Sequence, residues 1–436
     1  MKPAAPNATP THTASGLQHD DTSTADGLGM QRDWPPHRAE GLRRLAAFTP
    51  QMGRDYEAGR NFDHGPTRRA AVSLLSPYVR RRLVSEAELV RAALDLHGPD
   101  GAEKFIQEVF WRTYWKGWLE LRPGVWRDYR AGVVVDRAAA SRGAIASRLA
   151  DAEEGRTGID CFDAWAAELR DTGYLHNHAR MWMASIWIFT LSLPWRLGAD
   201  FFLRHLVDGD PAANTLSFRW VAGLHTVGKH YVADAANIER FTGGRFRPER
   251  LARAPALLVE DTPVPAPTPL PPGGALARGA RAALLITEED CQPETLGLDL
   301  AAIVAVATCL SSSARSDAPV SAVVTAFDRG ALHDAGVRAA ARGAPAAIAL
   351  PDTSARGQGD ALVDWARSTG ADVVVTAWVP TGPVRDRLDA ARPALEAAGL
   401  RLVMLRRSWD DAVWPHAKAG YFKVKERIPT LLREAM

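Results

Sequence analysis

A run of alternating prolines divides this 436-residue chain into two stretches with different hydrophobic patterns. The segment VEDTPVPAPTPLPPGG, residues 259–274, holds six prolines and indicates a stiff linker, because proline cannot donate the backbone hydrogen bonds of a helix or a sheet. We expect a first domain over residues 33–255, a linker over 256–275 and a second domain over 276–436. Residues 1–32 carry few large apolar side chains, so we expect them to be disordered.

The stretch before the linker has a helical pattern. Apolar residues recur every three or four positions in four segments, 85–94, 102–121, 161–173 and 178–193. Ten of the fourteen tryptophans lie in this stretch, and no alternating strand pattern of useful length interrupts it. The sequence therefore predicts a mainly α-helical first domain.

The stretch after the linker has a different pattern. Short apolar runs at 281–287, 346–350, 371–379 and 400–406 are typical of buried parallel strands. Segments of helical periodicity, such as GDALVDWARSTG and VRDRLDAARPALEAAG, lie between these runs. The fold class expected for the chain is a helical domain followed by a smaller α/β domain with a parallel sheet.

Composition narrows the class of protein only slightly. Charged residues at 24%, hydrophobic residues at 46% and a net charge of +2 are ordinary for a globular protein in water. No apolar run reaches the ~18 to 20 residues that span a bilayer, so we expect no membrane partner. The three cysteines, Cys161, Cys291 and Cys309, are far apart and offer no paired spacing for zinc or an iron–sulfur cluster, which favours a reducing cytoplasm.

The stretch GYLHNHARMWMASIW, residues 173–187, concentrates polar and aromatic side chains. His176 and His178 are two positions apart, so on a helix they point about 200° apart and cannot share a metal ion. Asn177 and Arg180 are three apart and share a face, where an amide and a guanidinium could meet one polar ligand. The alternative is a buried aromatic helix whose two polar residues are satisfied by the protein.

The stretch LVDGDPAANTLSFRWVAG, residues 206–223, carries two carboxylates and an amide, Asp208, Asp210 and Asn214. The carboxylates could accept hydrogen bonds from ribose hydroxyls or an adenine amino group. They could equally lie in a solvated loop that caps the next helix.

Two further stretches allow a functional and a structural interpretation. Ser73 and Ser76 could cradle a pyrophosphate with the amides of a helix start, or cap a helix before Pro77. The other stretch contains a carboxylate, a flat aromatic ring and a cation, which could bind an unstacked base. These three side chains could instead belong to an amphipathic helix with a stripe of core tryptophans. These residues are Glu108, Trp111 and Arg112.

Taken together, the motifs resemble the flavin-binding helical domain of DNA photolyases and cryptochromes. The resemblance covers roughly residues 50–247 and rests on the order of the motifs, which run from Tyr56 through Ser73-x-x-Ser76, Glu108-x-x-Trp111-Arg112, Asn177-x-x-Arg180-Met181 and Asp208-x-Asp210-x-x-x-Asn214. It implies FAD as the cofactor. The residues implied to bind it are Tyr56, Ser73 and Ser76 toward the phosphates, Asn177 and Arg180 along the flavin, Asp208 and Asp210 on the ribityl–adenine side, and Asn214 facing flavin N5. Arg112 is also implied to bind the cofactor.

The resemblance also implies an activity. Glu108, Trp111 and Met181 would contact a flipped pyrimidine dimer, to which reduced FAD passes an electron after absorbing blue light, with Asn214 stabilising the reduced flavin. The expected partner is damaged DNA and the expected state a monomer, while an antenna chromophore stays unspecified. Retention of Glu108, Trp111 and Met181 favours repair over signalling.

The chain departs from the family pattern in its aromatic residues and in its order of domains. Phe218 stands where a tryptophan normally adjoins the flavin, and Trp220 follows two residues later. Trp195 matches the usual electron-transfer chain, but no tryptophan lies in residues 130–164 for the distal position. The α/β segment follows the helical domain instead of preceding it, which suggests a circular permutation. A cryptochrome-type photoreceptor and a light-independent FAD-binding protein are therefore the alternatives.

Overall fold

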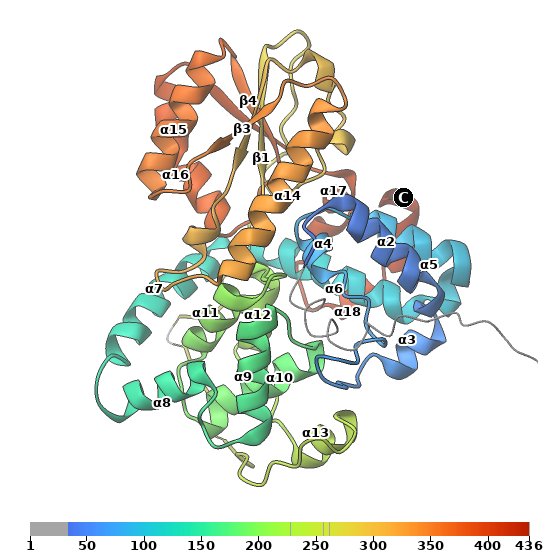
Figure 1. Cartoon of the computed structure of the whole chain (residues 1–436), viewed down its shortest axis with the longest axis vertical. Coiled ribbons are helices and arrows are strands. Elements are labelled where there is room, and N and C mark those ends of the chain that lie inside the picture. Colours follow the sequence, from blue (N-terminus) through green and yellow to red (C-terminus); the bar gives the residue numbers. More distant parts are fainter. Residues whose placement is uncertain (1–33, 227, 256, 261, 436) are drawn as a thin grey trace, which may run out of the picture.

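The structure is a computed structural model that describes residues 34–226, 228–255, 257–260 and 262–435. The disorder expected for residues 1–32 lies outside these ranges. A helical region, drawn in blue to green, occupies one end of the molecule, and the sheet with its helices, drawn in yellow to orange, occupies the other, while the red C-terminal helices lie beside the blue ones (Figure 1). Both predicted fold classes are confirmed, in the predicted order along the chain.

The helical region consists of helices that the hydrophobic periodicity largely predicts. Their bounds are α2 Arg38–Phe48, α3 Arg54–Gly59, α4 Ser76–Arg80, α5 Glu86–Gly101, α6 Glu103–Glu120, α7 Pro123–Ala139, α8 Gly143–Glu154, α9 Asp160–Thr172, α10 Asn177–Ser185, α11 Trp195–His205, α12 Pro211–Val221 and α13 Ala235–Phe241. The helix expected over 178–193 ends earlier, because α10 passes into a π-helical turn at Ile186–Thr190.

Local signals in the sequence explain where α5 begins and bends. The Ser85 hydroxyl accepts a hydrogen bond from the Glu88 amide, and the Glu88 carboxylate accepts one from the Ser85 amide, which together form a capping box. Gly98, at φ +66°, and Pro99 then kink the last turn, since neither continues a regular helix.

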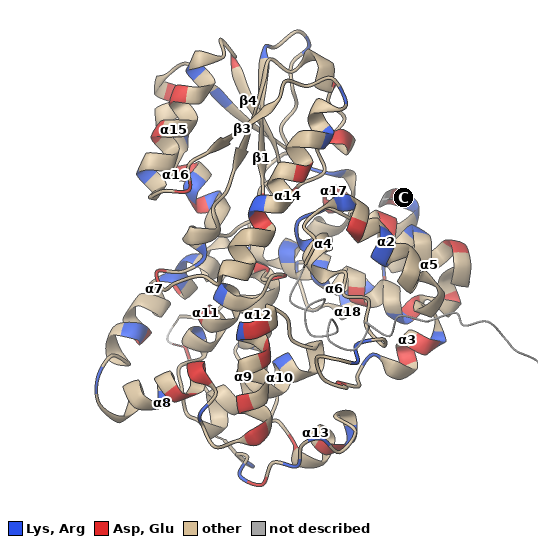
Figure 2. Cartoon of the chain, viewed as in Figure 1, with Lys and Arg blue, Asp and Glu red and all other residues tan. Residues whose placement is uncertain are grey.

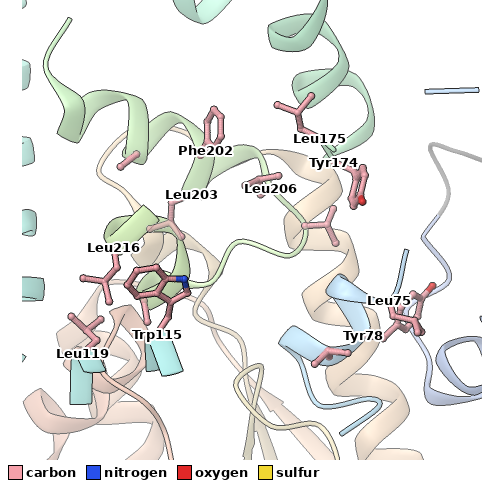
Figure 3. Packing of buried hydrophobic residues seen from close by; sticks show 14 of the residues in the cluster. Leu75, Tyr78, Trp115, Leu119, Tyr174, Leu175, Phe202, Leu203, Leu206 and Leu216 are labelled. Atoms are coloured by element: carbon pink, nitrogen blue, oxygen red, sulfur yellow. The ribbon is translucent and has the colours of Figure 1, made fainter. Parts of the chain in front are cut away.

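Helix α6 is the central element of the helical core. Thirteen of its eighteen residues are buried, which matches its nearly continuous aromatic and aliphatic sequence. Trp115 and Leu119 of α6 lie beside Leu216 of α12, with Leu203 of α11 next to them (Figure 3). A helix that is buried on most sides can carry functional residues on several faces at once.

The α/β region contains a five-stranded parallel sheet in the order β3-β2-β1-β4-β5. The strands are β1 Ala282–Thr287, β2 Ala305–Cys309, β3 Ala347–Leu350, β4 Val373–Ala377 and β5 Arg401–Leu405. Four of them fall on the predicted apolar runs, whereas β2, whose sequence is AVATC, was missed because a short run with threonine and two alanines gives little hydrophobic signal. The strand order reverses between β1 and β4, and ligands of doubly wound sheets bind at such points.

Helices cover both faces of this sheet. Alternate residues of β1 face opposite ways: Leu284 belongs to the cluster that includes Phe327 of α14, and Leu285 to the cluster that includes Leu362 of α15. The helices of the region are α14 Ala322–Ala340, α15 Ala355–Ser368, α16 Pro383–Ala397, α17 Ser408–Val413, α18 Phe422–Lys425 and α19 Ile428–Ala435. Helix α14 covers one face, and α15 and α16 cover the other (Figure 1).

The last three helices return to the helical region and pack on α6. The Trp409 indole lies 5.0 Å from the Phe110 ring between centroids, and its N–H donates to the Thr113 hydroxyl at 3.0 Å. Gly117 allows the closest approach, because a Cβ there would lie 2.8 Å from the Trp414 ring. The end of the chain is therefore part of the helical core. In the described ranges no helix is both long and apolar enough to cross a membrane.

Candidate functional site

The candidate site is a cluster of buried charged side chains around the turn between α11 and α12. Asp208 and Asp210 are only 4% and 3% exposed, so the alternative of a solvated loop is wrong. Asp210 does cap α12, since its Oδ1 accepts a hydrogen bond from the Ala213 amide at 2.9 Å. Capping occupies one carboxylate oxygen and leaves the other for a different partner.

Three cations from two other helices surround the second oxygen of Asp210. Oδ2 lies 3.5 Å from Arg112 Nη1 and 3.5 Å from Lys116 Nζ, both on α6, and 3.7 Å from Arg80 Nε at the end of α4. Burial alone would raise the pKa of Asp210, but these cations outweigh it and hold the pKa well below its usual range. Asp210 is thus an ionised carboxylate held among buried cations.

Asp208 is paired with the other predicted arginine. Arg180 on α10 donates from Nη2 to Asp208 Oδ2 at 2.9 Å and from Nε to the Leu175 carbonyl at 2.8 Å. Burial alone would raise the pKa of Asp208. Arg180 and the Ser76 hydroxyl lower the pKa by more than burial raises it, so the carboxyl stays ionised. Ser76 is the first residue of α4 and provides no side-chain cap, so its predicted capping role is wrong.

Three buried atoms of this cluster have no hydrogen-bond partner among the described residues. They are Arg112 Nη1, Asp208 Oδ1 and Asp210 Oδ2. Arg112 Nη1 and Asp210 Oδ2 form the 3.5 Å ion pair described above without a hydrogen bond, and Asp208 Oδ1 has no hydrogen bond. Buried polar atoms nearly always make hydrogen bonds, so these three can still bind a ligand or water. A donor and two acceptors of this kind fit FAD, whose phosphates accept hydrogen bonds and whose hydroxyl and amino groups donate them.

The other predicted cofactor residues lie at the edges of the cluster. Asn177 is exposed at the first turn of α10, and Asn214 donates to the Ala199 carbonyl at 2.7 Å. Ser73 is half-buried, and its hydroxyl accepts from the Leu75 amide at 3.3 Å. Tyr56 packs edge-on against Phe105, and burial raises the pKa of its phenol. In the described part of the chain, the Asn214 backbone amide donates to the Asp210 carbonyl at 2.8 Å, and no side-chain hydrogen bond or ion pair joins these four residues to Asp208 or Asp210.

The predicted lesion-contact residues lie on α6 and α10. Glu108 pairs with Arg60 at 2.9 Å and with Lys104 at 3.4 Å, and is about a quarter exposed. Trp111 and Met181 are half-buried. Trp111 precedes Arg112 on α6, so one helix carries both a cofactor-facing cation and an aromatic ring at the surface.

The predicted electron-transfer residues do not form one continuous chain. Trp195 is buried between the guanidiniums of Arg196 and Arg219, 5.0 and 5.7 Å from its ring, and neighbours Tyr129 at 5.9 Å. Trp220 instead stacks on Tyr231 at 5.7 Å.

Phe218 is buried and packs edge-on against Phe202 at 5.0 Å. Among the described residues no ring contact joins it to Trp195 or Trp220.

Sequence reasoning missed several residues of the site. Arg80 and Lys116 contact Asp210, and Arg80 is in turn held by two 2.5 Å hydrogen bonds to Glu289 of the α/β region. The triplet Arg80-Arg81-Arg82 and the acidic run after β1 were the available signals. His176 and His178 serve structural roles: His176 caps α10, and His178 stacks on Trp182 at 4.1 Å. In the described ranges no group of three or more potential metal ligands gathers.

Comparison with known proteins finds a similarity that covers part of the helical region. Residues 105–242 match the model for the FAD binding domain of DNA photolyase. The deoxyribodipyrimidine photo-lyase of Streptomyces griseus is 39% identical over 173 residues, which cover 39% of this chain and 36% of that protein. The enzyme of the same name from Agrobacterium fabrum is 32% identical over 204 residues, covering 44% and 39%.

Structural comparison gives a similar extent of coverage. A bacterial class III photolyase from Agrobacterium tumefaciens is 29% identical with a TM-score of 0.42, covering 51% of this chain and 46% of the other. The match thus spans less than half the length of each of these proteins. The matched residues include Arg112, Arg180, Asp208 and Asp210, whose unpaired or ionised atoms fit the cofactor. Residues 105–242 of the chain are thus similar to the FAD-binding domain of DNA photolyases.

Proposed function

We propose that the protein repairs pyrimidine dimers in DNA with blue light. The observation that carries the proposal is the set of unpaired buried atoms on Arg112, Asp208 and Asp210, within the stretch that matches the photolyase domain. FAD, when bound, supplies the light absorption and the electron. The remaining chemistry is positioning by the protein, because electron transfer falls steeply with distance and the lesion must lie beside the flavin.

The side chains would divide this positioning between cofactor and lesion. Arg112, with Ser73, Ser76 and Tyr56, would hold the phosphates, and Asp208 and Asp210 would accept hydrogen bonds from ribityl or adenine donors. Arg180 and Asn177 would line the flavin, and Asn214 would face flavin N5. Trp111 would stack on an extruded base, and Glu108 and Met181 would contact it from the same side.

We further propose that residues 33–255 form the FAD-binding unit, 256–275 the linker and 276–436 a permuted α/β unit. The proline-rich segment, with no helix or strand in its described residues, supports these bounds. The end of the α/β region returns onto α6, so the two regions stay attached there. In a chain whose α/β region came first, the connection into the helical region would lie at this contact, which also supports a permutation. The protein would act on damaged DNA as a monomer.

A repair assay tests the proposal directly. Chemically reduced protein, illuminated with blue light, should restore a dimer-containing oligonucleotide to intact strands, and the same mixture in the dark should not. Trp111→Ala should weaken binding to that oligonucleotide by about 1–3 kcal/mol while leaving the flavin absorbance unchanged. No light-dependent loss of dimers by a fully flavin-loaded protein would refute repair.

The cofactor assignment has its own test. Asp210→Ala removes a buried acceptor and leaves three cations without their carboxylate, so FAD affinity should fall by about 1–3 kcal/mol. Asp151→Ala is the matched control, since Asp151 forms an exposed ion pair with Arg156 on the far side of α8. A protein that neither copurifies with FAD nor takes it up would exclude the assignment.

Phe218 favours a second candidate function, a photoreceptor or a light-independent flavoprotein. Phenylalanine is much harder to oxidise than tryptophan, so it is a poor first donor to a photoexcited oxidised flavin. Illumination with a thiol donor should reduce the flavin slowly, and Phe218→Trp should speed this reduction. The larger ring would crowd Gly198, whose added Cβ would already lie 2.8 Å from Phe218, so flavin content has to be measured in parallel.

A further inference from the structure

Tyr421, from the far end of the chain, covers one face of Trp111. The two ring centroids lie 3.7 Å apart and the ring planes differ by 15°, which is a close parallel stack. An indole ring has two faces, so this contact leaves one face of Trp111 for any other ring. The residue proposed to grip a flipped base is thus held by a segment that follows the α/β region in the sequence.

Several hydrogen bonds fix this segment, which we define as the C-terminal wall, residues 418–425. The Tyr421 hydroxyl donates to the Gln107 carbonyl at 2.6 Å, and the Tyr114 hydroxyl donates to the Ala419 carbonyl at 3.0 Å. Arg122 Nη2 donates to the Lys418 carbonyl at 2.7 Å. Tyr421 is 4% exposed, so the wall is anchored from within.

Residues at the end of the wall and just after it are also buried. Val424 is fully buried, and Ile428 and Leu431 of the next helix are buried as well. A lid that opens to admit DNA would have to break these apolar contacts together with three hydrogen bonds. The geometry favours a permanent part of the surface over a movable cover.

The outer side of the wall differs from its anchored side. Phe422 is 71% exposed, and it is the only aromatic residue among the strongly exposed large apolar side chains in the described ranges. Residues 418–427 carry Lys418, Lys423, Lys425 and Arg427 against one carboxylate, Glu426. Elsewhere the two signs of charge are interspersed over both regions (Figure 2). An exposed ring among cations fits a single-stranded nucleic acid, whose bases stack and whose phosphates are negative.

We propose that the C-terminal wall is the second side of the lesion-binding surface, and that its partner is DNA with an unpaired or extruded base. Tyr421 is a positioning residue that holds the Trp111 ring, whereas Phe422 and the lysines contact the strand beside the lesion. This inference rests on the proposed function for the identity of the lesion, but the strand contact can be measured independently.

Binding measurements on three variants test the wall. Phe422→Ala changes an exposed side chain, so the fold should persist, and binding to a dimer-containing oligonucleotide should weaken about tenfold. Tyr421→Ala should weaken it by a similar factor, whereas Tyr421→Phe keeps the stacked ring and should bind within about twofold of the parent. Val135→Ala on α7 is the control, since Val135 is 67% exposed at a site away from the wall.

Salt dependence separates stacking from charge. Lys418→Ala and Lys423→Ala should each reduce the slope of log affinity against log salt by about one, because each removes one phosphate contact. Phe422→Ala should leave that slope unchanged. Flavin absorbance should stay at the parent value in all of these variants, which shows that the cofactor site is intact.

Each outcome separates this inference from the proposed function. Suppose that the parent prefers dimer-containing DNA and that Phe422→Ala and Tyr421→Ala bind it as tightly as the parent. The proposal that the wall binds DNA is then overturned, and the proposed function stands. Tighter binding by Tyr421→Ala would mean that the segment is an inhibitory cover instead. If the parent shows no preference but Phe422→Ala weakens binding to undamaged single strands, the proposed lesion specificity fails and the wall stands. A parent that binds no strand would overturn both.

Discussion

The helical region and the α/β region bury titratable side chains in opposite surroundings. In the helical region, burial and nearby arginines lower the pKa of His205 and of His225 to about 4, so both rings are neutral at pH 7. In the α/β region, burial and the carboxylates of Asp328 and Glu289 raise the pKa of Glu288 to about 8. Among the described residues, the α/β region buries five carboxylates against two arginines, whereas the helical region buries seven carboxylates and seven Lys or Arg side chains.

Buried charges of the two regions form ion pairs where the regions meet. Arg80, Arg81 and Arg82, which follow α4, contact carboxylates of the α/β region. The pairs are Arg80 with Glu289 at 2.5 Å, Arg81 with Asp328 at 2.5 Å, and Arg82 with Asp410 at 2.7 Å and Asp290 at 3.4 Å. All of these side chains are almost fully buried. The comparison teaches that arginines of the helical region pair with the buried carboxylates for which the α/β region has too few cations of its own.

The largest expected effect comes from breaking this interface. Arg82→Met keeps most of the side-chain volume but leaves Asp410 and Glu86 buried without their arginine, while Asp290 keeps only Arg407, so the free energy of unfolding should fall by about 3–5 kcal/mol. Denaturant unfolding followed by circular dichroism measures this. Arg156→Met, which removes a half-exposed pair with Asp151, should change stability by less than about 1 kcal/mol. Equal effects of the two variants would mean that the buried charges do not join the regions.

Acidification should weaken the helical region in particular. The pKa of His225 is lower in the folded chain than the ordinary 6.5, so between pH 6.5 and about 4 the unfolded chain binds more protons. Stability should therefore fall as pH drops through this window, by about 1.4 kcal/mol per pH unit for each such histidine. Unfolding curves taken from pH 7 to pH 4 measure this loss of stability per pH unit. His225→Gln should reduce it by the contribution of one histidine. An unchanged slope would place the acid sensitivity elsewhere.

Raising the pH should weaken the α/β region through Glu288. Its folded pKa lies above the unfolded value of 4.5, so its contribution is fully present below pH 4.5 and is lost as pH rises through about 8. Glu288→Gln mimics the protonated form and can still accept a hydrogen bond from the Ser311 amide, which lies 3.0 Å from the carboxylate. The variant should lose less stability than the parent between pH 5 and 8. A steeper loss in the variant would show that Glu288 is ionised in the folded protein.

The fold was largely predictable because its signals are local. The period of the apolar residues predicted α5, α6, α9 and α10 and four of the five strands, since a buried face imposes its own spacing on the sequence. Strand β2 and the π turn after α10 were not predicted. The strand is short and weakly apolar, and the π turn depends on how Trp187 packs between α9 and α11.

The candidate site was predictable in its residues but not in its contacts. The motif order placed Arg112, Arg180, Asp208 and Asp210 in one pocket, and the structure brings these four together. It did not indicate Lys116 or Arg80 as partners of Asp210, because each lies on a separate helix and carries no motif of its own.

The sequence by itself determined the two classes of structure, their order and the family motifs of the helical region. Each of these depends on residues close together in the chain, whose spacing reflects one helix face or one strand. Only the tertiary structure decided that Glu289 holds Arg80 against Asp210, and that Tyr421 stacks on Trp111 from 310 positions away. Such contacts join side chains whose separation along the chain carries no period, so they follow from how the helices and the sheet pack and not from any local pattern.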